Sequence, residues 1–317
     1  MMMKMEVSSF YYSRNSQFPP SDILVLQKKN FHYWKQHDTL HFSRIKCVFR
    51  PLYAQRGYKL QKHYHLQVSC SKKSETMVVE AGCMGAIYDS LAARLVPNAA
   101  AASSPNFKYI VGLAGPPGAG KSTLASEVVQ RVNKLWPEKV SSMDSQVQPP
   151  EVAIVLPMDG FHLYRKQLDA MENPEEAHAR RGAPWTFNPD LFLQCLKTLR
   201  NEGSVYAPSF DHGVGDPIED DIFVSLQHKI LVVEGNYVLL EDGVWKEVSS
   251  MFDEKWFIDV DLEKAMHRVL KRHISTGKTP DVAKWRVDYN DQPNAELVIK
   301  SKKNADLIIK SVDFIQS

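Results

Sequence analysis

Residues 115–123 read Gly115-Pro116-Pro117-Gly118-Ala119-Gly120-Lys121-Ser122-Thr123. This stretch matches the pattern GxxxxGK[ST], in which glycines let the backbone turn so that its N–H groups converge on phosphate oxygens. In such a loop Lys121 reaches the β and γ phosphates, and the Ser122 hydroxyl binds Mg²⁺. The stretch, called the phosphate loop below, therefore predicts a site for ATP and Mg²⁺.

A strand and a helix are predicted on either side of the phosphate loop. Before it, residues 109–114 form an apolar run of the length of a buried strand. After it, Leu124, Val128, Val132 and Leu135 are spaced by four, four and three positions, as on one face of a helix. This order puts the loop at a helix N-terminus, whose positive end favours phosphate. The alternative, a glycine-rich turn without a ligand, does not require this context.

Further strands and helices alternate along the chain. Apolar runs predict strands at residues 152–158, 230–233, 256–260 and 307–309. Helical spacing and capping residues predict helices at residues 86–96, 189–199 and 262–274. Strands separated by helices favour an α/β fold with a parallel sheet covered by helices on both faces.

The charge of the chain is unevenly distributed. The net charge of the 317 residues is +2, but residues 1–73 hold 13 Lys or Arg and three acids, a charge of +10, and the remainder carries −8. A basic, acid-poor segment that contains serines and shows little periodicity is typical of an organelle transit peptide. We therefore expect residues 1–73 to be a transit peptide or a disordered basic extension, and residues 74–317 to form one catalytic domain.

The composition and charge of the sequence also limit the cellular compartments and the binding partners that are expected. The N-terminal segment favours the chloroplast, with the mitochondrion or the cytoplasm as alternatives. A basic arm that binds nucleic acid is a further alternative for this segment, but the acidic remainder argues against a nucleic-acid partner for the domain. No run of 18 apolar residues is present, so no membrane partner is expected. The expected partner is a small molecule, and homo-oligomerisation is left open.

Two acidic residues follow predicted strands. Asp159 comes after strand 152–158, and Glu234 after strand 230–233. Because the carboxyl ends of parallel strands line the active crevice of such sheets, both carboxylates are expected near the phosphates. Asp159 is then a candidate general base or hydroxyl-orienting group, and Glu234 a candidate Mg²⁺ ligand together with Ser122. The alternatives are a helix or turn cap for Asp159 and an inert carboxylate for Glu234.

Two aromatic and polar stretches, residues 180–187 and 206–212, are candidates for the site of a phosphate acceptor. From them, and from the residues after Asp159, we expect the acceptor to be contacted by Asp159, His162, Arg181, Tyr206, Phe210 and His212. The alternatives are aromatic side chains in the core, a His212 that bonds a loop carbonyl, and arginines that pair with nearby acids.

A cationic helix face is the candidate lid over the phosphates. Lys264, Arg268 and Arg272 follow one another at four-residue steps, with Lys271 adjacent. Lid arginines can stabilise the charge of a phosphate in transfer. Arg268 and Arg272 are therefore candidate catalytic residues, together with Lys121. The alternative is a solvated cationic stripe.

Together these stretches resemble the uridine kinase, pantothenate kinase and phosphoribulokinase family of P-loop kinases. The resemblance covers roughly residues 87–309. It rests on the phosphate loop, Met158-Asp159-Gly160-Phe161-His162, residues 181–184, residues 206–212 and Val233-Glu234-Gly235-Asn236-Tyr237, in this order. The chain looks closest to a nucleoside or nucleotide kinase-like branch, which also carries Pro293-Asn294-Ala295.

The resemblance implies a three-layer P-loop NTPase fold with a small helical lid, and a kinase domain over residues 74–317. It implies ATP-dependent transfer to a hydroxyl of a small metabolite, with Asp159 as acid–base residue, His212 on the acceptor and Arg268 and Arg272 in the lid. Residues 211–216 depart from uridine kinases, which argues against uridine as the acceptor. The alternative function is an NTP-binding or NTP-hydrolysing regulatory protein, although the sequence lacks Asn-Lys-x-Asp and Leu-Ser-Gly-Gly.

Overall fold

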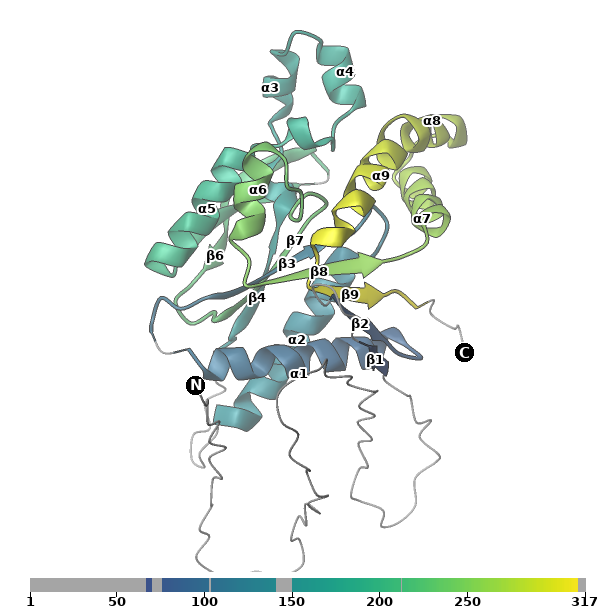
Figure 1. Cartoon of the computed structure of the whole chain (residues 1–317). Helices are drawn as coiled ribbons and strands as arrows, with labels where there is room; N and C mark the ends of the chain where they lie inside the picture. The colour runs from purple at the N-terminus through teal and green to yellow at the C-terminus, as the bar shows by residue number, and fades with distance from the viewer. Residues whose placement is uncertain (1–66, 70–75, 103, 141–149, 212, 313–317) are drawn as a thin grey trace, which may run out of the picture. The chain divides into compact units, whose positions relative to one another are not determined.

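The structure is a computed structural model and describes residues 67–69, 76–102, 104–140, 150–211 and 213–312. Its centre is a seven-stranded sheet (Figure 1) with the strand order β1-β2-β9-β8-β3-β7-β4. The strands are β1 Gln67–Ser69, β2 Met77–Glu80, β3 Tyr109–Ala114, β4 Ala153–Pro157, β7 Ile230–Glu234, β8 Glu254–Asp259 and β9 Leu307–Lys310. All neighbours pair in parallel except β1 and β2, which are antiparallel. The parallel sheet expected from the sequence is confirmed.

Helices lie between these strands and at one end of the sheet. The α-helices are α1 Met84–Ala100, α2 Lys121–Val140, α3 Arg165–Asp169, α4 Pro174–Ala179, α5 Pro189–Glu202, α6 Gly243–Ser250, α7 Leu262–Ser275, α8 Pro280–Arg286 and α9 Gln292–Lys300. Shorter helical turns are η1 Met158–Phe161, η2 Pro184–Thr186 and η4 Ser301–Asn304, and a π-helix, η3, spans Val287–Asp291. No helix in the described part of the chain is long and apolar enough to cross a membrane.

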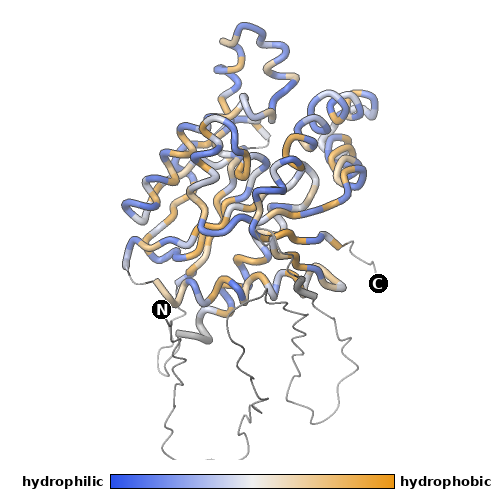
Figure 2. The backbone as a smooth tube through the Cα atoms, in the orientation of Figure 1, coloured by the Kyte–Doolittle hydropathy of each residue, from blue (hydrophilic) through white to orange (hydrophobic). Residues whose placement is uncertain are grey.

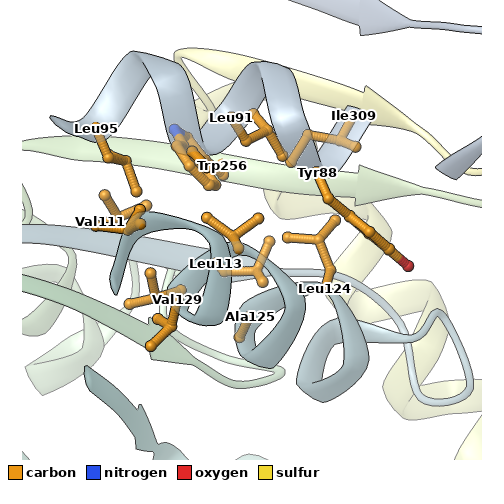
Figure 3. Packing of buried hydrophobic residues seen from close by; sticks show 14 of the residues in the cluster. Tyr88, Leu91, Leu95, Val111, Leu113, Leu124, Ala125, Val129, Trp256 and Ile309 are labelled. Atoms are coloured by element: carbon orange, nitrogen blue, oxygen red, sulfur yellow. The ribbon is translucent and has the colours of Figure 1, made fainter. Parts of the chain in front are cut away.

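The side chains of β3 divide between two hydrophobic cores. Val111 and Leu113 pack with α1 and α2, and Figure 3 shows Leu113 together with Leu91 of α1. Ile110 and Ala114 join the core under α5 and α6. Because successive side chains of a strand point to opposite faces, this division shows that helices cover the sheet on both sides. The three-layer fold is confirmed, and Figure 2 shows hydrophobic residues concentrated along the central strands.

The first strand of the described residues lies before residue 74, at which the catalytic domain was predicted to begin. Residues 1–73, predicted to be a transit peptide or a disordered basic extension, lie outside the described residues apart from β1. In β1, Val68 is paired with Val79 of β2. The transit peptide or extension and the domain boundary at residue 74 stay predictions. A run of three residues carries too little periodicity to be recognised without its pairing partner.

A two-stranded hairpin, which the sequence analysis did not predict, stands beside the main sheet. It consists of β5 Val205–Asp211 and β6 Asp216–Val224. The register shifts between Ala207 and Ser209, so Pro208 stands at a bulge, where its missing N–H costs no ladder hydrogen bond. This bulge interrupts the alternation of side chains that would reveal the strand in the sequence.

Close contact with the turn η1 holds the hairpin in place. A Cβ built on Gly160 of η1 would lie 2.0 Å from the Pro208 carbonyl oxygen, so no side chain fits there. We expect Gly160→Ala to lower the free energy of unfolding by about 1–3 kcal/mol, because backbone must move to admit the methyl group. Urea denaturation of both chains measures this change.

Gly85 supplies the control for this variant. It lies in α1, and its Cβ would come no closer than 3.9 Å to the Cys83 sulfur. Gly85→Ala should therefore leave the stability unchanged or raise it slightly, because alanine restricts the unfolded chain. Equal stabilities of the Gly160→Ala and Gly85→Ala proteins would contradict the close packing of η1 on the hairpin.

Candidate active site

The phosphate loop lies between β3 and α2, as the sequence predicts. Gly118 and Gly120 have φ angles of +78° and +91°, which favour glycine. Helix α7 approaches the loop closely, since a Cβ on Gly118 would lie 2.3 Å from the Ala265 carbonyl oxygen. Gly118 is therefore required for its conformation and for space, and the loop is held between α2 and α7.

The Lys121 ammonium is buried among oxygen acceptors at the start of α2. Its Nζ donates hydrogen bonds to the carbonyl oxygens of Gly115 (3.0 Å) and Pro116 (3.3 Å) and to Asn236 Oδ1 (2.7 Å). Burial lowers the pKa of Lys121, and the carboxylates of Glu234 and Asp159 oppose this shift. The ammonium is thus fixed over the loop where a phosphate would lie. The sequence analysis did not single out Asn236, although it follows Glu234 by two positions in the quoted motif.

Glu234 and Ser122 form the candidate metal site. The Ser122 hydroxyl donates to Glu234 Oε1 at 2.8 Å, and Glu234 is only 7% exposed. Burial raises the pKa of Glu234, as does the charge of Asp159, while Lys121 and the Ser122 hydrogen bond lower it. A hydroxyl and a carboxylate are the hard oxygen ligands that Mg²⁺ prefers, with phosphate oxygens completing its shell. The described residues contain no cluster of three or more His, Cys, Asp or Glu able to hold a metal without phosphate.

The sheet register brings the candidate residues of three strands together. Glu234, at the end of β7, is paired with Leu113 of β3 on one side and with Pro157 of β4 on the other. The phosphate loop begins two residues after Leu113, and Asp159 comes two residues after Pro157. The Asp159 carboxylate is close enough to shift the pKa values of Lys121 and Glu234. Lys121, Asp159 and Glu234 therefore share one site at the carboxyl edge of the sheet.

An aromatic wall extends from Asp159. The His162 ring lies between Phe187 and Phe210, with ring centroids 3.9 Å and 4.6 Å away. His162 Nδ1 is 2.8 Å from the Asp159 carbonyl oxygen. The Arg181 guanidinium lies over the Phe210 ring at 5.7 Å. Three of the predicted acceptor residues, His162, Arg181 and Phe210, are thus brought together next to Asp159.

Arg181 is held by its own partners. Its Nη2 donates to the Leu163 carbonyl oxygen at 2.9 Å and to Asp216 Oδ1 at 3.2 Å. Its acidic partner, Asp216, lies 35 positions away along the chain. Burial lowers the pKa of Arg181, and Asp216 opposes the shift. Its guanidinium therefore stands in a fixed position beside the wall.

The two remaining predicted acceptor residues are not part of the wall itself. Tyr206 is 59% exposed, and its ring stacks on Phe223 with centroids 4.5 Å apart. It lines, together with His162, a cavity of about 360 Å³ between the hairpin and α5. His212 lies outside the described residues. Its predicted contact with the acceptor stays a prediction.

The predicted lid helix, α7, lies against the phosphate loop. Ala265, Met266 and Val269 are buried, which confirms the apolar face. Arg268 Nη1 donates to the Gly118 carbonyl oxygen at 3.3 Å. The charge of Arg272 contributes to the lowered pKa of Lys121, so Arg272 lies within electrostatic reach of the site. At least one cation of α7, Arg268, is therefore hydrogen-bonded to the phosphate loop.

Parallel strands that end at a phosphate loop are the framework of the P-loop nucleotide-binding proteins, and this architecture places the chain in that class. The comparison with protein families narrows the class. The model of the Phosphoribulokinase / Uridine kinase family matches residues 110–316. The chain belongs to this family of ATP-dependent kinases, and the resemblance drawn from its motifs is confirmed.

Relatives within this group carry different names. A Schizosaccharomyces pombe protein named "Putative uridine kinase C227.14" is 38% identical over 209 residues, covering 65% of this chain and 84% of that protein. The "ATP-dependent kinase-like protein notR'" of Aspergillus versicolor is 39% identical over 152 residues, covering 46% and 88%. A crystal structure named "putative fructose transport system kinase", from Silicibacter sp. TM1040, has a TM-score of 0.57 and 28% identity, covering 69% and 98%. These names agree on a kinase and differ on its acceptor.

Proposed function

We propose that this chain transfers the γ phosphate of ATP to a hydroxyl group of a small metabolite, with Mg²⁺ bound at Ser122 and Glu234. The acceptor is of the nucleoside, sugar or vitamin-precursor kind. The observation that carries the proposal is the strand register, which puts Asp159, two residues after Pro157, at the same sheet edge as Glu234 and the phosphate loop. Lys121 and Glu234 suffice to bind a nucleotide, whereas a hydroxyl acceptor benefits from a base at the adjoining strand end.

The chemistry follows from the places of these side chains. The Asp159 carboxylate accepts the proton of the acceptor hydroxyl while the oxygen of that hydroxyl attacks the γ phosphorus. The bond from that phosphorus to the β–γ bridging oxygen breaks, and ADP leaves. Lys121 donates to phosphate oxygens from one side, and Arg268 and Arg272 of α7 face them from the other. Charge that spreads over the transferring phosphoryl group is thus met by fixed cations.

A bound Mg²⁺ would neutralise charge on the β and γ phosphates and help to orient them in line with the acceptor. The chain provides a hydroxyl and a carboxylate for it, and both belong to elements that are already packed. The Glu234 carboxylate is buried, and the Ser122 hydrogen bond and the charge of Lys121 hold it in place. Ser122 and Glu234 would thus bind the metal ion, and the Asp159 carboxylate would remain able to accept the proton of the acceptor hydroxyl.

The wall of His162, Phe187, Phe210 and Arg181 is the proposed acceptor site. The aromatic rings, which are tilted relative to His162, offer apolar surface, and the Arg181–Asp216 pair offers one donor group and one acceptor group. Such a surface suits a flat or hydroxyl-bearing molecule.

The chloroplast remains the proposed destination of the protein. This proposal depends on the charge of residues 1–73 and on nothing within the described residues.

A screen of acceptors tests the proposal. The full chain is incubated with ATP, Mg²⁺ and single members of a panel of nucleosides, sugars, pantothenate and glycerate, and both ADP and the phosphorylated acceptor are measured. We expect at least one acceptor to raise ADP formation above the rate without acceptor and to appear as its phosphate ester. A steady ATP hydrolysis that no acceptor changes would instead favour an NTP-hydrolysing regulatory protein.

A further inference from the structure

Residues 181 and 182 belong to a short loop between α4 and η2, and side chains from distant parts of the chain hold its carbonyl oxygens. Asn290 Nδ2 donates to the Arg181 carbonyl oxygen at 2.9 Å. The Tyr237 hydroxyl donates to the Gly182 carbonyl oxygen at 2.5 Å. Gly182 has a φ angle of +102°, so the loop turns here in a conformation that favours glycine. Since the loop makes no strand or helix of its own, these contacts fix its path.

Asn290 is placed by an irregular helix. It lies in the π-helix η3, between α8 and α9, where one extra residue is accommodated in a turn. It is 3% exposed, and Asn294, one turn later, donates from Nδ2 to its Oδ1 at 3.0 Å. This bond occupies the oxygen of the Asn290 amide, so its nitrogen is directed at Arg181.

The residue before Asn290 makes a second connection to the same region. Arg180 Nη1 donates to the Tyr289 carbonyl oxygen at 3.0 Å, and the guanidinium lies 5.6 Å from the centre of the Tyr289 ring. The Tyr289 hydroxyl donates to Glu176 Oε2 at 2.6 Å. Two consecutive residues of η3 therefore contact both α4 and the loop that follows it.

The other end of this connection reaches the phosphate loop. Asp291 of η3 pairs with His273 of α7 at 2.8 Å. Helix α7 in turn contacts the phosphate loop through Arg268 and Gly118. Figure 1 shows α7, α8 and α9 grouped together at one end of the sheet. The π-helix thus joins the nucleotide side of the site to the loop that carries Arg181.

We propose that Asn290 is a positioning residue for the acceptor. It fixes the Arg181 backbone, so that the Arg181 guanidinium keeps its hydrogen bonds to the Leu163 carbonyl oxygen and to Asp216. In this position the guanidinium completes the wall beside Asp159. The inference rests on the proposed function, because it gives Arg181 a place in the acceptor site. Without the Asn290 hydrogen bond, the loop and the Arg181 guanidinium shift. A larger fraction of the ATP is then hydrolysed by water instead of transferring its phosphate to the acceptor.

Asn290→Ala removes the hydrogen bond, and Asn290→Asp keeps the shape of the side chain while replacing the donor nitrogen by an acceptor. For both we expect kcat/KM for the acceptor to fall about 10- to 100-fold, since small displacements in such sites have effects of this size. The KM for ATP should stay within about threefold, because Asn290 donates its hydrogen bond to the loop that carries Arg181 and not to the phosphate loop. The fraction of ATP lost to hydrolysis should rise.

Gln292→Ala is the matched control. It removes a carboxamide two residues further along the chain, at the start of α9, where Gln292 Nε2 donates to the exposed Glu296 and to no other described residue. Its kinetic constants and its melting temperature should equal those of the parent. A loss of acceptor kcat/KM in Gln292→Ala equal to that in Asn290→Ala would overturn the assignment, as would full acceptor kcat/KM in both Asn290 variants.

Hydrogen exchange separates this inference from the proposed function, because it requires no acceptor. The Gly182 amide donates to Thr186 Oγ1 and the Ala183 amide to the Arg180 carbonyl oxygen, so both report on the loop. We expect faster exchange at these amides in Asn290→Ala and unchanged exchange in Gln292→Ala. Unchanged exchange in Asn290→Ala overturns the inference. A parental chain that phosphorylates nothing in the panel overturns the proposed function, whatever the exchange shows.

Discussion

Lys121→Ala is expected to lower kcat/KM for ATP by about 10³-fold or more. The ammonium is a cation held over the phosphate loop by hydrogen bonds, and its removal takes away a fixed donor to the phosphates. It also leaves Asn236 Oδ1 and two carbonyl oxygens of the phosphate loop without their donor. We therefore expect weaker ATP binding as well as slower transfer. Titration with a fluorescent ATP analogue and steady-state kinetics measure the two effects separately.

Lys134→Ala provides the control for this variant. Lys134 lies on the same helix, α2, and its side chain is exposed. Its removal changes the net charge by the same amount but takes nothing from the site, so ATP binding should be unchanged. Comparable losses in the two variants would mean that net charge, rather than the position of Lys121, governs nucleotide binding.

Asp159→Asn is expected to reduce kcat by about 10²- to 10⁴-fold while ATP still binds. The amide keeps the size of the carboxylate but cannot accept the proton of the acceptor hydroxyl. The phosphate loop, Lys121 and Glu234 are unchanged, so the nucleotide site remains. Steady-state rates with the acceptor found in the screen, together with ATP titration, test both halves of this expectation.

Asp221→Asn is the corresponding control, because Asp221 is an exposed acid on β6. It should transfer phosphate at the parental rate. If Asp159→Asn also did so, Asp159 would not be the base, and the carboxylate would serve only to orient the turn η1 or to balance the charge of Lys121.

The fold was predictable where short stretches carry their own signal. The phosphate loop and the strand and helix around it lie within residues 109–140, and the predicted ends of two other strands pointed to Asp159 and Glu234. The hairpin was not predictable, because Pro208 and the bulge interrupt its alternation. Strand β1 is recognised only through its pairing with β2.

The acceptor side shows why residue types alone are insufficient. Phe210 and Tyr206 are both aromatic and only four positions apart, yet the Phe210 ring packs against His162 whereas the Tyr206 ring is 59% exposed and stacks on Phe223. The bulge at Pro208 separates them, and nothing in their local sequence reveals it. Asn290 was also missed, since its role depends on a π-helix and on a contact 109 positions away along the chain.

The strand order has a consequence for how this protein is made. Strand β3, which leads into the phosphate loop, pairs Tyr109 with Ile230 of β7 and Val111 with Glu254 of β8. Contacts between residues so far apart in sequence close slowly. During synthesis, the apolar residues of β3 must therefore wait for both neighbouring strands to leave the ribosome, and until then they are a site for aggregation or for chaperone binding. The same interior position that buries β3 in the finished protein leaves its apolar residues without partners in the growing chain.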